Sequence, residues 1–173
     1  MKITLIKPRM GTPDQTLYVE EGRMEPLTLS VIASLTPPEV DVVIHDDRME
    51  AIPFDDPTDL VGITIETWTA RRAYQIAAEY RRRGVPVIMG GVHATLAPDE
   101  VQQHADSVFT GDAEQGWSDV VGDSMAGRLK RRYVAAPGRR HGRRLQQPLD
   151  VAEIGDACLV DPGETNVEID VAS

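Results

Sequence analysis

Residues 60–91 read LVGITIETWTARRAYQIAAEYRRRGVPVIMGG, and this stretch decides the fold. It begins and ends with short apolar runs rich in β-branched residues, which are typical of strands buried on both faces of a sheet. The segment between them predicts a helix over residues 69–83, with apolar side chains at helical spacing, arginines in the last turn and Gly84 as C-cap. A strand, a helix and a strand in this order predict parallel strands joined by a right-handed crossover.

The same alternation continues on both sides of this unit. Strands are predicted at residues 3–6, 40–44, 60–65, 85–89 and 107–110, and further helices at 26–35, 98–104 and 114–125. We therefore expect an α/β fold with a doubly wound, five-stranded parallel sheet of order 2-1-3-4-5, which is flavodoxin-like or Rossmann-like. In such sheets, ligands bind outside the carboxyl ends of the strands.

Composition and charge predict how the 173 residues are organised. The chain is 41% hydrophobic, which is enough for a core, and its formal net charge is −10. Residues 1–127 sum to −11, residues 128–144 to +8 and residues 145–173 to −7. These changes predict a compact domain over 1–127 and a C-terminal extension over 128–173. The basic segment is short and only 5% of all residues are aromatic, so we expect a linker and no nucleic-acid binding.

The sequence also indicates where the protein resides. No apolar run approaches the roughly 20 residues that cross a bilayer, and the N-terminus lacks the pattern of a signal peptide. We therefore expect no membrane span and a cytoplasmic localisation. The one cysteine, Cys158, excludes a disulfide framework and an intrachain metal site built on several thiolates. His45, Asp46 and Asp47 are adjacent, but neighbours on a strand point to opposite faces, so we expect a solvated strand end rather than a metal site.

Candidate ligand-binding residues follow the predicted strands. Gly90 and Gly91 come directly after one strand, where the lack of a Cβ allows close approach of a ligand, and Thr64 ends the central strand. Together they predict a groove for a flat, extended group, or else a simple turn and a local hydrogen bond. His93 lies on the same face, in contact with the ligand or with loop backbone. The loop over residues 7–25 is long for its position, and such loops are usually functional.

Several motifs in fixed order resemble a known family. DLVGIT at 59–64, RGVPVIMGGVHAT at 83–95 and TGDAE at 110–114 resemble the N-terminal cobalamin-binding domain of cobalamin-dependent radical S-adenosylmethionine (radical SAM) enzymes. EPL at 25–27 is similar to the family's opening of the first helix, and GRLK at 127–130 to the following linker. The resemblance covers essentially the whole chain, and its specificity lies in the combination of motifs.

The resemblance implies a cobalamin over the carboxyl ends of the strands, with its nucleotide tail in the groove between sheet and helices. A histidine that could bind cobalt is missing from the loop after the first strand, so the resemblance implies base-off cobalamin without a protein histidine ligand. Asp112 replaces a glutamate that is usual in the family. The cofactor-binding residues carried over from the family or placed on the same loops are Arg9, Met10, Gly11, Thr64, Glu66, Thr67, Gly90, Gly91, His93, Gly111 and Glu114.

The resemblance further implies a methyltransferase that uses S-adenosylmethionine and a 4Fe–4S cluster held by a Cys-x3-Cys-x2-Cys motif. Because this chain has only Cys158, we expect it to bind cobalamin without being catalytic. Its extension would lead toward a radical SAM catalytic domain, with the strand-like residues 166–173 just before the cysteine loop. The alternatives are a stand-alone cobalamin carrier or sensor, and a flavodoxin-like domain that has lost cofactor binding.

Overall fold

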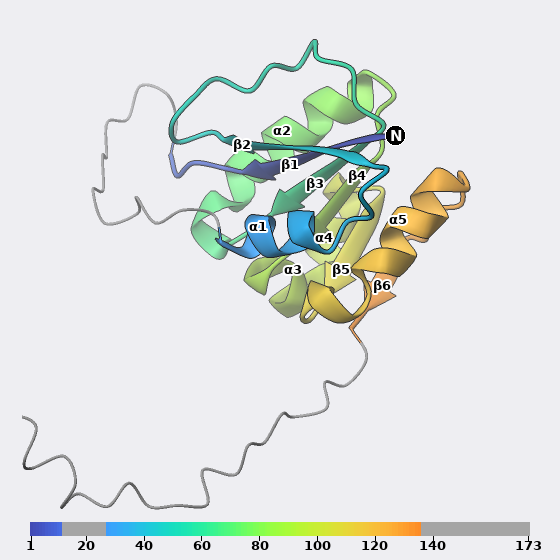
Figure 1. Ribbon diagram of the computed structural model, residues 1–173. Helices are drawn as coiled ribbons and strands as arrows, with labels where there is room; N and C mark the ends of the chain where they lie inside the picture. The colour runs from blue at the N-terminus through green and yellow to red at the C-terminus, as the bar shows by residue number, and fades with distance from the viewer. Residues whose placement is uncertain (12–26, 136–173) are drawn as a thin grey trace, which may run out of the picture. The chain divides into compact units, whose positions relative to one another are not determined.

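A parallel sheet forms the centre of the protein (Figure 1). The computed structural model describes residues 1–11 and 27–135. The predicted fold class is confirmed, and the strands lie in the order β2-β1-β3-β4-β5-β6. The strands are β1 (Lys2–Lys7), β2 (Asp41–Asp46), β3 (Leu60–Thr64), β4 (Val87–Gly90), β5 (Ser107–Thr110) and β6 (Arg132–Val134).

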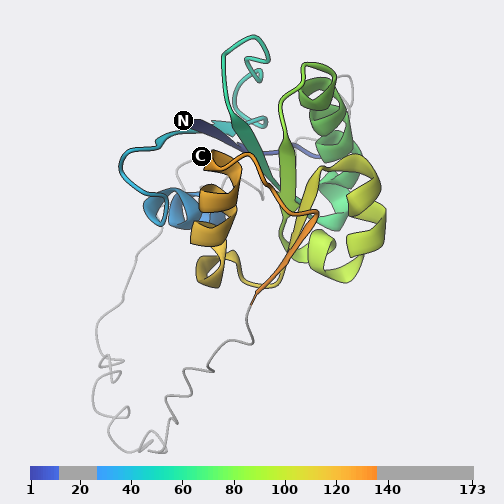
Figure 2. The ribbon, with the colours of Figure 1, turned by 90° about the vertical axis from the view of Figure 1, so that its right-hand side faces the viewer.

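Helices cover both faces of the sheet, so the fold is doubly wound. Figure 2 shows α1 and α5 on one face and α2, α3 and α4 on the other. The longest of the described helices, α2, lies within the segment predicted to be helical. The arginines of its last turn lie at the negative end of the helix dipole. The helices are α1 (Leu27–Ser34), α2 (Ala70–Arg82), α3 (Val92–Leu96), α4 (Pro98–His104) and α5 (Trp117–Met125).

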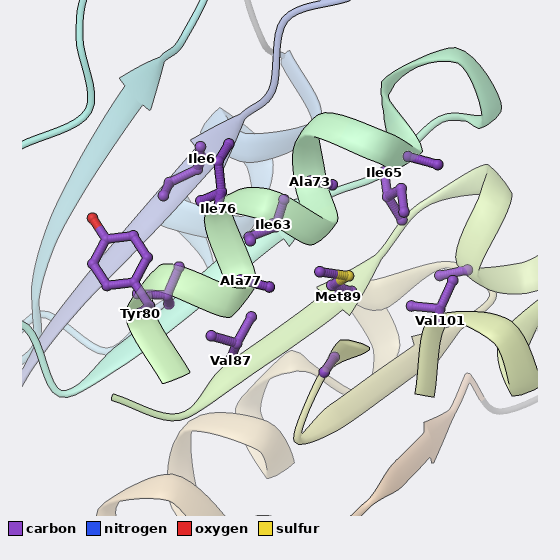
Figure 3. Close-up of a cluster of buried hydrophobic side chains, with 14 of the residues drawn as sticks. Ile6, Ile63, Ile65, Ala73, Ile76, Ala77, Tyr80, Val87, Met89 and Val101 are labelled. Carbon is purple, nitrogen blue, oxygen red and sulfur yellow. The ribbon is translucent and has the colours of Figure 1, made fainter. Parts of the chain in front are cut away.

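Each face of the sheet has its own apolar core because successive strand residues point to opposite sides. On the α2 face, Ile63 of β3 and Met89 of β4 pack with Ala73, Ile76 and Tyr80 of α2 (Figure 3). On the other face, side chains from β1 and β5 pack with those of α1 and α5. Burial on both faces explains why these strands are continuously apolar rather than alternating.

The sixth strand, β6, lies within residues 128–173, which the charge pattern predicts to be an extension. It has only three residues, of which Tyr133 alone is buried, so it carries no strand pattern of its own. Its parallel register on β5 and the hydrogen bond from the Tyr133 hydroxyl to Asp123 of α5, 3.0 Å long, hold it in the sheet. The strand predicted near residue 166 and Cys158 lie outside the described residues. None of the described helices combines the length and the hydropathy needed to span a membrane.

Candidate functional site at the carboxyl edge

The central feature of the carboxyl edge is Gly91, directly after β4. Its φ of +105° and ψ of −171° define a conformation that is essentially restricted to glycine. A Cβ at this position would lie 2.9 Å from the Ile65 carbonyl oxygen and 3.1 Å from Thr64 Oγ1. The loops after β3 and β4 therefore approach each other too closely for a side chain at Gly91. The sequence predicted close approach of a ligand to the glycine pair, whereas at Gly91 the close neighbour is the protein's own loop after β3.

Hydrogen bonds join three of the predicted loops. The backbone N–H of His93 donates to the Ile65 carbonyl oxygen over 3.1 Å, which links the loops after β4 and β3. The N–H of Gly111 donates to Thr95 Oγ1 over 3.0 Å, which links the loop after β5 to α3. The structure thus brings the candidates after β3, β4 and β5 to one continuous edge.

Ion pairs tie the end of β1 to the neighbouring loops. Lys7 Nζ lies 2.9 Å from the Glu66 carboxylate after β3. The backbone N–H of Arg9 donates to Asp47 over 3.2 Å, and Arg72 of α2 donates to the same carboxylate twice, each time over 2.7 Å. The expectation of a solvated strand end is wrong for Asp47, which is only 4% exposed. Asp47 is covered because α2 packs beside the end of β2 and places the Arg72 guanidinium on its carboxylate.

At the end of β2, Arg48 donates to the Asp46 carboxylate over 2.6 and 2.8 Å. Burial acts to raise the pKa of Asp46, but the hydrogen bonds and charge of Arg48 outweigh it and hold the pKa below its usual range. The hydrogen bond to Asp47 likewise raises the pKa of Arg72 against the opposing effect of burial. The edge beside β1 and β2 is therefore a fixed arrangement of paired charges.

Exposed apolar side chains occur on several segments that follow the strands at this edge. Trp68 is 64% exposed in the turn after β3, and Val92 and Leu96 of α3 are 64% and 74% exposed. Met10, after β1, is also exposed. Exposed apolar residues scattered singly are common, whereas these lie on segments that follow neighbouring strands at one edge of the sheet. We name Trp68, Val92 and Leu96 the apolar rim.

The other sequence candidates lie on the same edge. Thr67 is exposed within the short turn Thr67–Thr69, whereas the ring of His93 is buried at 8% exposure and contacts Thr67. Glu114 is exposed in the turn Ala113–Gln115 before α5, and Gly11 has a φ of +74°. The sequence did not predict the side-chain contacts that support this edge, because no motif connects residues so distant along the chain. The residues that make these contacts are Asp47, Arg72, Tyr74 and Glu100.

The chain is similar to known proteins. The model of the B12 binding domain matches residues 21–121. The chain is 39% identical over 118 residues to bacteriochlorophyllide d C-8(2)-methyltransferase of Chlorobaculum tepidum, covering 66% of this chain and 26% of that protein. It is 34% identical over 138 residues to bacteriochlorophyllide d C-12(1)-methyltransferase of the same organism, covering 78% and 30%. The chain thus spans less than a third of the length of these two relatives.

One solved structure is also similar. The N-terminal domain of a hypothetical protein from Thermotoga maritima matches with a TM-score of 0.42 and 23% sequence identity. The match covers 61% of this chain and 84% of that one.

Proposed function

The chain belongs to the family of B12-binding domains, and from this premise we propose that it holds cobalamin at the carboxyl edge as one domain of a radical SAM methyltransferase. The observation that carries the proposal is the apolar rim on the turn after β3 and on α3. Trp68, Val92 and Leu96 offer exposed apolar surface. The missing Cβ of Gly91 lets the loops after β3 and β4 pack directly against each other. This combination fits a large, partly apolar ligand such as a corrinoid.

The residues proposed to hold the cofactor come from each loop of the edge. When bound, cobalamin supplies a cobalt centre that can carry a methyl group. The protein's own part is to bind and orient it, and the hydrogen bonds among the loops after β3, β4 and β5 keep that surface preformed. The proposed contacts are Arg9, Met10, Gly11, Thr64, Glu66, Thr67, Gly90, Gly91, His93, Gly111 and Glu114.

We further propose that the cofactor binds base-off and without a histidine ligand to cobalt. The loop that begins after β1 contains no histidine in its sequence, and residues 8–11 carry Arg9 and Met10 instead. Both ring nitrogens of His93 already contact protein side chains. These two observations support a lower cobalt face that sees Arg9, Met10 or water.

Catalysis is assigned to a separate domain. A 4Fe–4S cluster needs several cysteine thiolates, and Cys158 is the single cysteine of this sequence. The methyltransferase relatives are three to four times as long as the parts that match. We propose that residues 1–127 bind cobalamin and that residues 128–173, which include β6, lead toward a radical SAM domain that holds the cluster and S-adenosylmethionine.

A hydroxocobalamin titration of the purified chain, followed by visible absorbance, tests the proposal. The expected result is saturable binding near one equivalent, with a spectrum that lacks nitrogen coordination to the lower face of cobalt. Gly91→Ala should weaken binding at least tenfold, whereas Gly84→Ala, at another positive-φ glycine with no atom near its would-be Cβ, should leave it unchanged. Absent binding, or equal losses in both variants, would contradict the proposal.

A further inference from the structure

Four side chains form a hydrogen-bonded chain beneath the carboxyl edge. Thr67 Oγ1, in the turn after β3, lies 3.3 Å from His93 Nδ1, and His93 Nε2 lies 3.3 Å from the Tyr74 hydroxyl of α2. The Tyr74 hydroxyl donates to Glu100 of α4 over 2.9 Å. The chain thus runs from an exposed threonine at the candidate site, through a buried histidine, to a carboxylate on the protein surface.

The carboxylate sets the direction of every hydrogen bond in this chain. An ionised carboxylate only accepts hydrogen bonds, so the single proton of the Tyr74 hydroxyl points to Glu100. The tyrosine oxygen can then only accept from His93, and Glu100 itself lies 3.6 Å from Nε2. Both oxygens that face Nε2 are therefore acceptors, and Nε2 carries the ring proton. In neutral histidine this leaves Nδ1 as an acceptor, which receives the proton of the Thr67 hydroxyl.

The surroundings keep these groups in place. The His104 ring stacks on Tyr74 with 3.9 Å between centroids and 15° between planes, which fixes the phenol ring. Burial, followed by the hydrogen bond to Glu100, raises the pKa of Tyr74, so the phenol stays protonated. His93 is only 8% exposed, so its ring meets its protein partners more than bulk water. The Thr67 backbone is held by the reciprocal hydrogen bonds between Glu66 and Thr69.

We propose that Glu100, Tyr74 and His93 are positioning residues that turn the Thr67 hydroxyl proton inward and present its oxygen as an acceptor to the bound cofactor. The inference rests on the proposed function. A corrinoid carries carboxamide groups around its rim, and their N–H groups are the donors that such an oxygen would select. A hydroxyl that is free to rotate could hydrogen-bond to donors and acceptors alike. The hydrogen-bonded chain of these four side chains, which we call the relay, therefore makes the contact specific for an N–H group.

The first test measures the tautomer of His93 in the cofactor-free chain. Long-range proton–nitrogen NMR of the full chain labelled with ¹⁵N-histidine, at pH 8, distinguishes a protonated Nε2 from a protonated Nδ1, and a His93→Gln spectrum assigns the signal. The expected result is protonation at Nε2, with Tyr74→Phe raising the Nδ1-protonated fraction. Tyr80→Phe, at the other tyrosine of α2, is the matched control and should leave the tautomer unchanged. Protonation mainly at Nδ1 in the wild type would overturn the relay.

The second test measures hydroxocobalamin affinity. Thr67→Val should weaken binding about fivefold, the loss of one net hydrogen bond, and Thr67→Ser should restore it. Tyr74→Phe should weaken binding about threefold, and Tyr80→Phe should not. Equal affinities of wild type and Thr67→Val would refute the contact. A wild-type chain that binds no hydroxocobalamin would refute the proposed function and the Thr67 contact with it, while the tautomer measurement still decides the relay.

Discussion

The Gly91→Ala substitution perturbs the carboxyl edge at its most constrained point. The backbone conformation of Gly91 costs about 1–3 kcal/mol for any other residue. The added Cβ would lie 2.9 Å from the Ile65 carbonyl oxygen, which accepts from the His93 N–H, and the Ile65 N–H donates to the Gly90 carbonyl oxygen over 2.8 Å. Moving Ile65 away weakens one of these bonds, which costs about 1 kcal/mol. We therefore expect a loss of about 3 kcal/mol in the free energy of unfolding.

Gly84→Ala separates backbone strain from the steric clash. Gly84 has a φ of +79°, and no atom lies within 4 Å of its would-be Cβ, so the expected cost is about 1 kcal/mol from the backbone alone. Urea unfolding followed by far-ultraviolet circular dichroism gives both values by linear extrapolation. If Gly91→Ala costs no more than Gly84→Ala, the close contact between the loops after β3 and β4 does not constrain the protein, and the reasoning fails.

Three further predictions concern the ion pairs and β6. Asp47→Asn removes the buried carboxylate that pairs with the half-buried Arg72, and it should lower the free energy of unfolding by about 3 kcal/mol in urea, more than Asp46→Asn does; equal losses would contradict the role of Asp47. Tyr133→Phe should lower the free energy of unfolding by about 1–2 kcal/mol. An unchanged midpoint of urea unfolding would show that the Tyr133 hydroxyl does not anchor β6. Hydrogen bonds from Arg82 and its neighbour lower the pKa of Glu79 from 4.5 to about 2, so its stabilisation is complete above pH 4.5 and lost toward pH 2. Glu79→Gln should flatten stability over that range, and an unaltered acid profile would contradict the pairing.

The order of the motifs along the chain predicted more of the candidate site than any single residue did. The place of Gly91 after a strand predicts close approach of a ligand, and the structure shows that the protein's own loop after β3 is what requires a glycine there. His93 was predicted on the ligand face, and its position relative to Thr67 and Tyr74 could not be derived from spacing. Tyr74 and Glu100 lie 26 residues apart, and only the packing of α2 beside α4 brings them into contact.

The sequence by itself determined the alternation of strands and helices, the order of the predicted parallel strands and the edge at which we propose that a ligand binds. These follow from local patterns, because two-sided burial, helical spacing and glycines after strands are all visible within short windows. The tertiary structure decided the burial of Asp47, the direction of the hydrogen bonds beneath Thr67 and the addition of β6. Each depends on groups that meet only when separate elements pack together, and a pattern read along the chain does not contain those distances.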